Sequence, residues 1–153
     1  MIGMGAWYGI ADGTIDAAAM YHRHYSHTNY LHKKPKLFCG PGEKMVLMTT
    51  ERGALFVWRK FIDKSDQQGI NCAIFRNERP DLYRSSELIL EAEVLAWTRW
   101  PGERLYTYVN SRKVNSVNPG YCFKMAGWTI CGITKARKLL IFEKLYKSAL
   151  EEE

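Results

Sequence analysis

Residues 70–100 read INCAIFRNERPDLYRSSELILEAEVLAWTRW, and the rest of the expected fold is arranged around them. It opens with an apolar run, passes through a polar turn that contains arginines, and continues in a segment whose apolar residues repeat with helical spacing. The apolar residues of that segment are Leu88, Ile89, Ala92, Leu95 and Ala96. Pro101 and Gly102 follow and end the helix. The stretch therefore predicts a strand, a turn and a helix.

The start of this helix is the first candidate site. Ser85 or Ser86 is a natural N-cap, because a hydroxyl accepts hydrogen bonds from the unpaired N–H groups of the first turn. Those N–H groups, the positive end of the helix dipole and the guanidinium of Arg84 together suit a phosphate. The alternative is that two serines and an arginine merely cap a surface helix.

Length and composition are those of one ordinary domain, at 153 residues with 46% apolar and 25% charged. We expect a single domain over residues 1–150 and an acidic tail at 151–153. The net charge of +6 favours an anionic partner such as DNA or a phosphorylated cofactor, although a scattered solvated surface gives the same count. Basic residues also gather at 135–138. The residues expected at nucleic acid are Lys33, Lys34, Lys36, Arg112 and Lys113.

The chain shows no sign of a membrane or secretory protein. Its N-terminus lacks a basic region before the apolar part, and no apolar run approaches the roughly 20 residues of a membrane helix. Cys39, Cys72, Cys122 and Cys131 have neither C-x-x-C nor paired spacing, so we expect reduced core residues. A cytoplasmic protein without a membrane partner is expected.

The remaining elements follow from short apolar runs and turn residues. Strands are expected at residues 6–11, 44–50, 54–62, 70–75, 104–110, 128–133 and 139–145, and helices at 15–26, 85–99 and 121–126. Residues 28–43 are polar, basic and rich in proline and glycine, and we expect them to cover a groove. The fold class predicted is α/β (α+β), with a mixed sheet of six to seven strands flanked by helices.

The end of the first helix carries a dense cluster of potential ligands and acid–base groups, His22-Arg23-His24-Tyr25-Ser26-His27. His24 and His27 lie one turn apart on a helix face. No carboxylate accompanies them at ligand spacing, so the metal signal is weak and no metal site is predicted. Partly buried packing is the alternative interpretation.

The order of elements is strand, helix, loop, three strands, helix, strand, short helix and two strands. Residues 118–128, NPGYCFKMAGW, resemble the "Asn…Phe-Tyr-x-x-x-Gly-Phe" segment near the end of GNAT-type acyltransferases. The resemblance covers most of the chain. It implies a GNAT-like sheet whose central strands, 70–75 and 105–110, splay around acetyl-CoA or another acyl-CoA, with the pyrophosphate at the turn 77–86.

The chain departs from the GNAT pattern at two places. The glycine-rich pyrophosphate loop is missing, and Arg84-Ser85-Ser86 stands in its place. The tyrosine that often serves as general acid aligns with Phe123, which has no proton to donate. Tyr121, two residues earlier, is either a substitute or a packing residue. The residues expected at the CoA thioester are Phe75, Arg76, Arg84, Ser85, Ser86, Asn118, Phe123 and Lys124.

Within the superfamily, the chain is most similar to phage Mom-type DNA-modification proteins. The similar features are the serine-for-glycine turn, the His-Tyr-Ser run and the Asn-Pro-Gly-Tyr-Cys-Phe-Lys segment. Those GNAT-like proteins alter the exocyclic amine of adenine. The resemblance implies a DNA-modifying acyltransferase, in the host cytoplasm. His24 has a suitable pKa for a base, Tyr25 or Tyr121 would protonate the leaving thiolate, and Asn110 would hold acceptor or water. The expected catalytic set is His24, Tyr25, Ser26, Asn110 and Tyr121.

Two other functions stay open. A GNAT N-acetyltransferase for a small amine or a protein lysine would have an acidic acceptor groove instead of a basic one. A non-catalytic GNAT-like protein that binds nucleic acid is favoured by Phe123 and by the missing glycines, whereas the retained Arg84-Ser85-Ser86 start argues against it. The oligomeric state, a dimer included, is also open.

Overall fold

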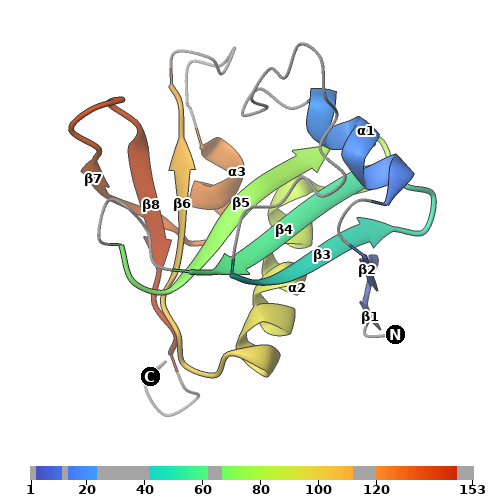
Figure 1. Cartoon of the computed structure of the whole chain (residues 1–153), viewed down its shortest axis with the longest axis horizontal. Helices are drawn as coiled ribbons and strands as arrows, with labels where there is room; N and C mark the ends of the chain where they lie inside the picture. The colour runs from blue at the N-terminus through green and yellow to red at the C-terminus, as the bar shows by residue number, and fades with distance from the viewer. Residues whose placement is uncertain (1–2, 12–13, 24–41, 62–66, 112–119, 148–153) are drawn as a thin grey trace.

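A computed structural model describes residues 3–11, 14–23, 42–61, 67–111 and 120–147. In these ranges the strands form one sheet in the order β1-β2-β3-β4-β5-β6-β8-β7, with α1 on one face and α2 on the other (Figure 1). The strands are β1 (Gly3–Met4), β2 (Trp7–Ile10), β3 (Glu43–Thr49), β4 (Ala54–Lys60), β5 (Ile70–Asn77), β6 (Leu105–Val109), β7 (Thr129–Ile133) and β8 (Leu140–Lys144). The helices are α1 (Ile15–Arg23), α2 (Ser85–Arg99) and α3 (Tyr121–Met125).

The predicted mixed α/β class is confirmed, and each strand expected from the sequence is present. The sheet has eight strands where six to seven were expected, because the two-residue β1 pairs with β2. α2 has the predicted bounds, and α3 ends near Gly127, which takes the left-handed conformation (φ +91°) that suits a glycine after a helix. α1 is confirmed as far as Arg23, and the rest of its predicted length lies outside the described residues.

The packing of α2 on the sheet follows the predicted apolar stripe. All five predicted residues are buried, and Glu93 is buried beside them. Two tryptophans from the sheet hydrogen bond to this helix: Nε1 of Trp7 donates to the carbonyl of Leu88 at 2.8 Å, and Nε1 of Trp58 donates to that of Ala92 at 2.9 Å. Burying a large ring while satisfying its N–H fixes both the position and the rotation of the helix.

The opposite face of the sheet packs against α1. Ala17 and Met20 of α1 are fully buried, in a cluster with Val46, Val57 and Ile74 from three neighbouring strands. The sheet therefore carries apolar contacts on both faces, which explains why residues 54–58 form a continuous apolar run without alternation.

β5 and β6 form the parallel pair of the described sheet, and their pairing is short. It runs from Ile70 opposite Leu105 to Cys72 opposite Thr107, where the Thr107 hydroxyl donates to the carbonyl of Cys72 at 2.8 Å. β5 continues for five more residues and β6 for two, without a further pair between them. Figure 1 shows the two strands diverging toward their carboxyl ends. We call residues 73–77 and 108–109 the β5–β6 divergence.

A β-bulge lies at the first residue of this divergence. Trp58 of β4 is opposite Cys72 and Val57 is opposite Ile74, so Ala73 has no partner on β4. Cys72 packs in the core under α2, whereas Ala73 and Ile74 both pack on the α1 side. Phe75 then returns to the α2 side. The extra residue thus reverses which side chains of β5 face α2 and which face α1. From Phe75 onward, the odd-numbered side chains at the end of β5 face α2.

The structure also bears on the predictions about a membrane and about the cysteines. None of the described helices is long and apolar enough to cross a membrane. Cys72 is buried, Cys122 is half-buried, Cys131 is exposed on β7, and all three are free thiols. The expectation of a core residue is therefore wrong for Cys131, because β7 is the last strand of the sheet and almost all its side chains face solvent. Cys39 lies outside the described residues.

Candidate active site

The loop between β5 and α2, residues 77–84, is held by one asparagine side chain. Nδ2 of Asn77 donates to the carbonyl of Tyr83 at 2.9 Å and to the hydroxyl of Ser85 at 3.1 Å. Oδ1 of Asn77 accepts from the backbone N–H of Arg79 at 2.9 Å. Asn77 reaches these groups because the bulge turned the end of β5 toward α2. A half-buried amide with three hydrogen bonds fixes the start of the helix relative to the strand.

The prediction that Ser85 or Ser86 caps α2 is wrong. The N-cap is Arg84, in an extended conformation (φ −77°, ψ 126°) and without a side-chain capping bond. Both serines lie inside the first helical turn, and the Ser85 hydroxyl serves Asn77 instead. The Arg84 carbonyl accepts from the N–H groups of Glu87 and Leu88. Within the described part of the chain, the backbone N–H groups of Ser85 and Ser86 therefore have no acceptor.

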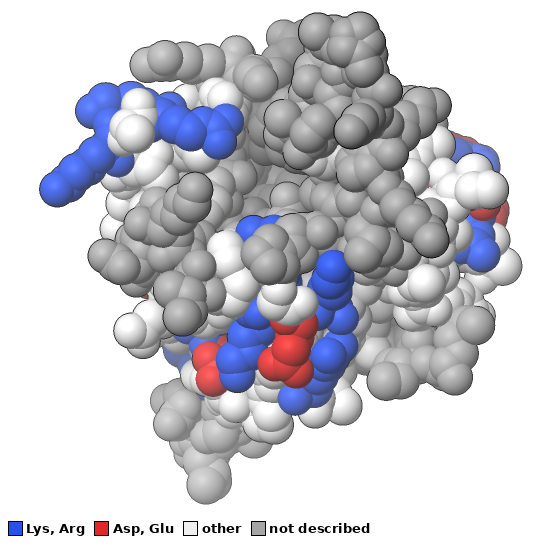
Figure 2. Space-filling model, in the orientation of Figure 1, with Lys and Arg blue, Asp and Glu red and all other residues white. Residues whose placement is uncertain are grey.

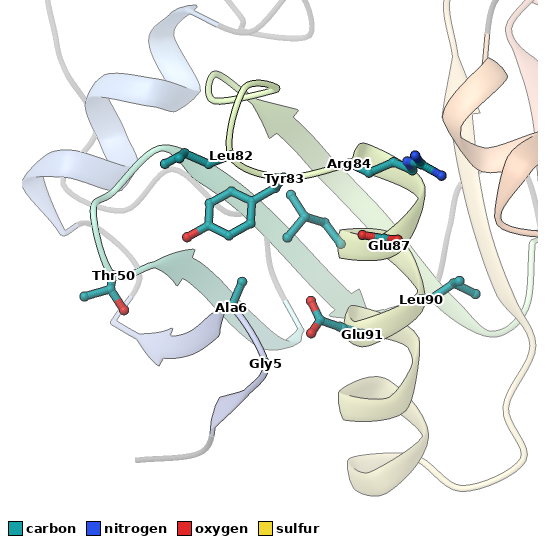
Figure 3. A pocket seen from close by; sticks show the side chains of 10 residues that line it. Gly5, Ala6, Thr50, Leu82, Tyr83, Arg84, Glu87, Leu90 and Glu91 are labelled. Atoms are coloured by element: carbon teal, nitrogen blue, oxygen red, sulfur yellow. The ribbon is translucent and has the colours of Figure 1, made fainter.

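Arg84 adds a positive charge to this helix start. Its side chain is exposed and makes no ion pair with a described residue. Arg84 is also one of the residues that line the groove drawn in Figure 3. Two unsatisfied N–H groups and a guanidinium thus lie at one helix end, which is the arrangement that accepts an anion.

The neighbouring α3 contributes an aromatic contact to the divergence. The rings of Phe75 and Phe123 meet edge to face, with their centroids 6.1 Å apart. Phe123 is 6% exposed and also packs against Trp128 at 5.0 Å, so it is a core residue. Tyr121 is 56% exposed, and Lys124 is exposed with its Nζ 6.0 Å from the ring of Phe142. Of the predicted α3 residues, Phe123 faces the interior and Tyr121 faces solvent.

The remaining described candidates lie at the ends of β5 and β6. Nε of Arg76 is 2.6 Å from Oε2 of Glu78, so its charge is already balanced by a carboxylate. Asn110 directly follows β6 and is half-buried. Nine predicted residues lie outside the described part of the chain: His24, Tyr25, Ser26, Lys33, Lys34, Lys36, Arg112, Lys113 and Asn118.

A groove of about 690 Å³ runs along the opposite side of the helix start (Figure 3). It is lined by the end of the loop before α2, by the first turns of α2, by the β1–β2 turn and by Thr50. Its charged groups are Arg84, Glu87 and Glu91. Burial raises the pKa of the Glu91 carboxyl above its ordinary value, and the nearby Glu87 adds to this, although a backbone hydrogen bond from Ala6 opposes them. The two carboxylates outnumber the one cation, Arg84, so the charge of this groove disfavours a diphosphate.

The sequence interpretation missed a buried ion pair that joins α2 to β8. Nζ of Lys144 is 2.7 Å from Oε1 of Glu93, and Nε1 of Trp128 donates to Oε2 of Glu93 at 2.8 Å. Lys144 also donates to the carbonyl of Ala126 at 2.8 Å, which closes the end of α3. Glu93 is four residues after the buried Ile89, and this helical spacing is the signal that places it on the inner face.

No group of three histidine, cysteine or acidic side chains suited to a metal ion occurs among the residues that the structure describes. His24 and His27 are not among those residues. Neither a scan against protein-family models nor a search of curated proteins finds a match for this chain. The proposal for its function therefore depends on the geometry of β5, β6 and α2 and on the resemblance stated above.

Proposed function

We propose that this chain is a GNAT-like acyltransferase that binds acetyl-CoA or another acyl-CoA at the β5–β6 divergence and transfers the acyl group to an exocyclic amine of a DNA base, as in phage Mom-type DNA modification. The observation that carries the proposal is the short parallel pairing of β5 and β6, which ends at Cys72 and Thr107 beside a bulge. The strands separate there, and the same end of β5 leads into α2. This is the arrangement that the resemblance to GNAT-type proteins implies.

The cofactor's diphosphate would lie at the start of α2. The N–H groups of Ser85 and Ser86 lack acceptors among the described residues, and the positive end of a 15-residue helix favours an anion there. Arg84, the N-cap residue of this helix, would add a charge-assisted contact. In this proposal the backbone N–H groups bind the diphosphate, as expected from the sequence, and the Ser85 hydroxyl is engaged by Asn77.

The acyl group would lie between the diverging strands. Beyond Cys72, the backbone of β5 has no partner on β6, so an N–H there is available to stabilise the oxyanion that forms on the thioester carbonyl. The base amine attacks this carbonyl, a C–N bond forms, and the C–S bond breaks to release the CoA thiolate. His24 would take the proton from the amine, and Tyr25 or Tyr121 would protonate the thiolate. Phe123 cannot, because it carries no ionisable group.

The acceptor would be DNA. The net charge of +6 favours a polyanion, and a base amine reaches such a site only when the base leaves the stack. A small-amine acceptor would call for an acidic groove at the divergence. The acidic groove of Figure 3 lies on the other side of α2 and includes no residue of β6, so it does not provide that acceptor position.

Calorimetric titration tests the cofactor part of the proposal. Acetyl-CoA and CoA should bind, whereas acetyl-pantetheine, which lacks the diphosphate, should bind at least about tenfold more weakly. Ser85→Pro removes one backbone N–H at the first helical position, where proline is tolerated, and Ser85→Ala removes only the hydroxyl. Ser85→Pro should weaken CoA binding and Ser85→Ala should not. No heat with either CoA compound would overturn the cofactor site.

Mass spectrometry of nucleosides tests the reaction. Duplex DNA incubated with the protein and acetyl-CoA should yield a nucleoside heavier by one acetyl group. Acetylation of spermidine or of a lysine peptide without any change in DNA would favour the small-amine or protein acetyltransferase. CoA binding without turnover on any of these acceptors would favour the non-catalytic alternative, for which Phe123 is the supporting feature.

A further inference from the structure

The turn between β7 and β8, residues 134–139, carries an exposed basic cluster. Lys135, Arg137 and Lys138 are all exposed, and none forms an ion pair with a described residue. We call these three residues the hairpin cluster. Figure 2 shows blue side chains gathered at the upper left, over the tip of this hairpin, without a red one among them. Elsewhere on the same face, basic and acidic residues lie side by side.

The turn that presents the cluster is tightly hydrogen bonded. The N–H of Thr134 donates to the carbonyl of Leu139 at 2.9 Å, and the N–H of Leu139 donates to the hydroxyl of Thr134, also at 2.9 Å. Lys138 has φ +56°, a left-handed conformation that a glycine or an asparagine adopts at lower cost.

The register of the sheet places this turn beside the proposed active site. Val109, the last residue of β6, is opposite Leu140, the first residue of β8, and Ile133 is opposite the same Leu140. The turn that joins β7 and β8 is therefore next to Asn110, at the carboxyl end of β6 where the β5–β6 divergence opens. The turn and the divergence thus lie on the two sides of β6, at the same end of the sheet.

We infer that the hairpin cluster binds the phosphate backbone of DNA next to the base that has left the stack. This inference rests on the proposed function, since it assigns a further binding element to the same DNA substrate. Three unpaired cations on a rigid turn suit successive phosphates, and such contacts set the register of a duplex without reading its sequence. Ile133 is the exposed apolar neighbour of the turn, and a membrane surface would engage it together with the cations.

Fluorescence anisotropy with a labelled duplex, over a series of salt concentrations, tests the inference. The test variant is Lys135→Gln with Arg137→Gln, and the matched control is Lys60→Gln with Lys147→Gln, which removes the same charge from two exposed lysines away from the turn. Log K falls as log salt rises, and each phosphate contact contributes about 0.9 to the steepness of that fall. The test variant loses two contacts, so the slope should become shallower by about 1.8. The control should change it by less than half of that.

Lys138→Gly separates charge from folding. Glycine relieves the left-handed strain, so this variant should melt at a higher temperature than the natural chain and still bind DNA more weakly. The hairpin cluster is excluded as a DNA contact if the natural chain binds DNA and the test and control variants bind it equally. That result would leave CoA binding and nucleoside modification, and hence the proposed function, intact. Loss of binding to anionic vesicles, with DNA binding unchanged, would assign the cluster to a membrane surface instead.

Discussion

The side-chain amide of Asn77 donates to the hydroxyl of Ser85 at 3.1 Å, and this contact joins the last residue of β5 to the first residue of α2. Asn77→Ala removes it together with two further hydrogen bonds of the loop, so we expect a loss of about 1–3 kcal/mol in the free energy of unfolding. Ser85→Ala removes one bond and should cost about 1 kcal/mol. Urea unfolding measures both values.

A double-mutant cycle of Asn77→Ala and Ser85→Ala isolates the contact between them. We expect a coupling energy of about 0.5–1 kcal/mol, because the second substitution has no bond left to break. Strict additivity of the two losses would mean that the pair does not interact in solution. Neither substitution removes a backbone N–H of the proposed anion site, so CoA affinity should change little in Ser85→Ala.

The buried pair of Glu93 and Lys144 should make stability depend on pH. Burial raises the pKa of the Glu93 carboxyl above 4.5, although the hydrogen bonds from Lys144 and Trp128 oppose it. Between the ordinary and the raised pKa, the folded protein keeps a proton that the unfolded chain has lost. This carboxyl therefore lowers the free energy of unfolding as the pH rises through that window, and the loss is complete above the raised pKa.

Lys144→Met should enlarge this effect. The substitution leaves the carboxylate of Glu93 buried with only the Trp128 N–H, which costs about 3 kcal/mol near pH 7. The deficit should shrink toward pH 4, where Glu93 becomes protonated and the buried charge is gone. Urea unfolding at several pH values measures it, with the exposed Lys147→Met as the control. A deficit that is the same at pH 4 and pH 7 would contradict the assignment to Glu93.

Local patterns predicted α2 well. Its apolar residues recur every three or four positions, and the helix buries that stripe wherever it docks, so sequence spacing alone identified Leu88 to Ala96 as its inner face. The boundary at Pro101 and Gly102 is equally local. Glu93 lies on the same inner face, but its partner Lys144 is 51 positions away, and no local pattern indicates a contact at that separation.

The end of β5 was harder to predict for a physical reason. Residues 70–75 are almost all apolar, so they contain no alternation from which a bulge at Ala73 is visible. The bulge depends on pairing with β4 and sets which way Phe75 and Asn77 point. Nδ2 of Asn77 in turn donates to the Ser85 hydroxyl, and this contact replaces the expected serine cap. The bulge at Ala73, which the sequence pattern does not reveal, therefore explains why the prediction of a serine cap was wrong.

Gly5 should tolerate substitution less well than Gly102. Both have positive φ, +56° and +75°, so alanine at either position costs about 1 kcal/mol in backbone strain. A Cβ at Gly5 would also overlap the carboxylate of Glu91, whereas Gly102 has nothing within 4 Å of that position. Gly5→Ala should therefore cost about 1 kcal/mol more than Gly102→Ala in urea unfolding, since Glu91 must leave its bond with Ala6. The double variant Gly5→Ala with Glu91→Ala should recover that excess, and an equal cost at both glycines would contradict the contact.

The described cysteines should report whether the paired end of β5 and β6 opens. Cys131 is exposed on β7, so N-ethylmaleimide should label it rapidly in the folded protein. Burial raises the pKa of the Cys72 thiol strongly, and the Thr107 hydroxyl holds the backbone at its carbonyl, so Cys72 should stay unlabelled until the protein unfolds. Peptide mass spectrometry assigns each site, and Cys131→Ser should abolish only the rapid label there. Labelling of Cys72 at the rate of Cys131 would mean that β5 and β6 also separate at their last pair, Cys72 and Thr107. The proposed acyl site would then lack the fixed strand pair beside which it is placed.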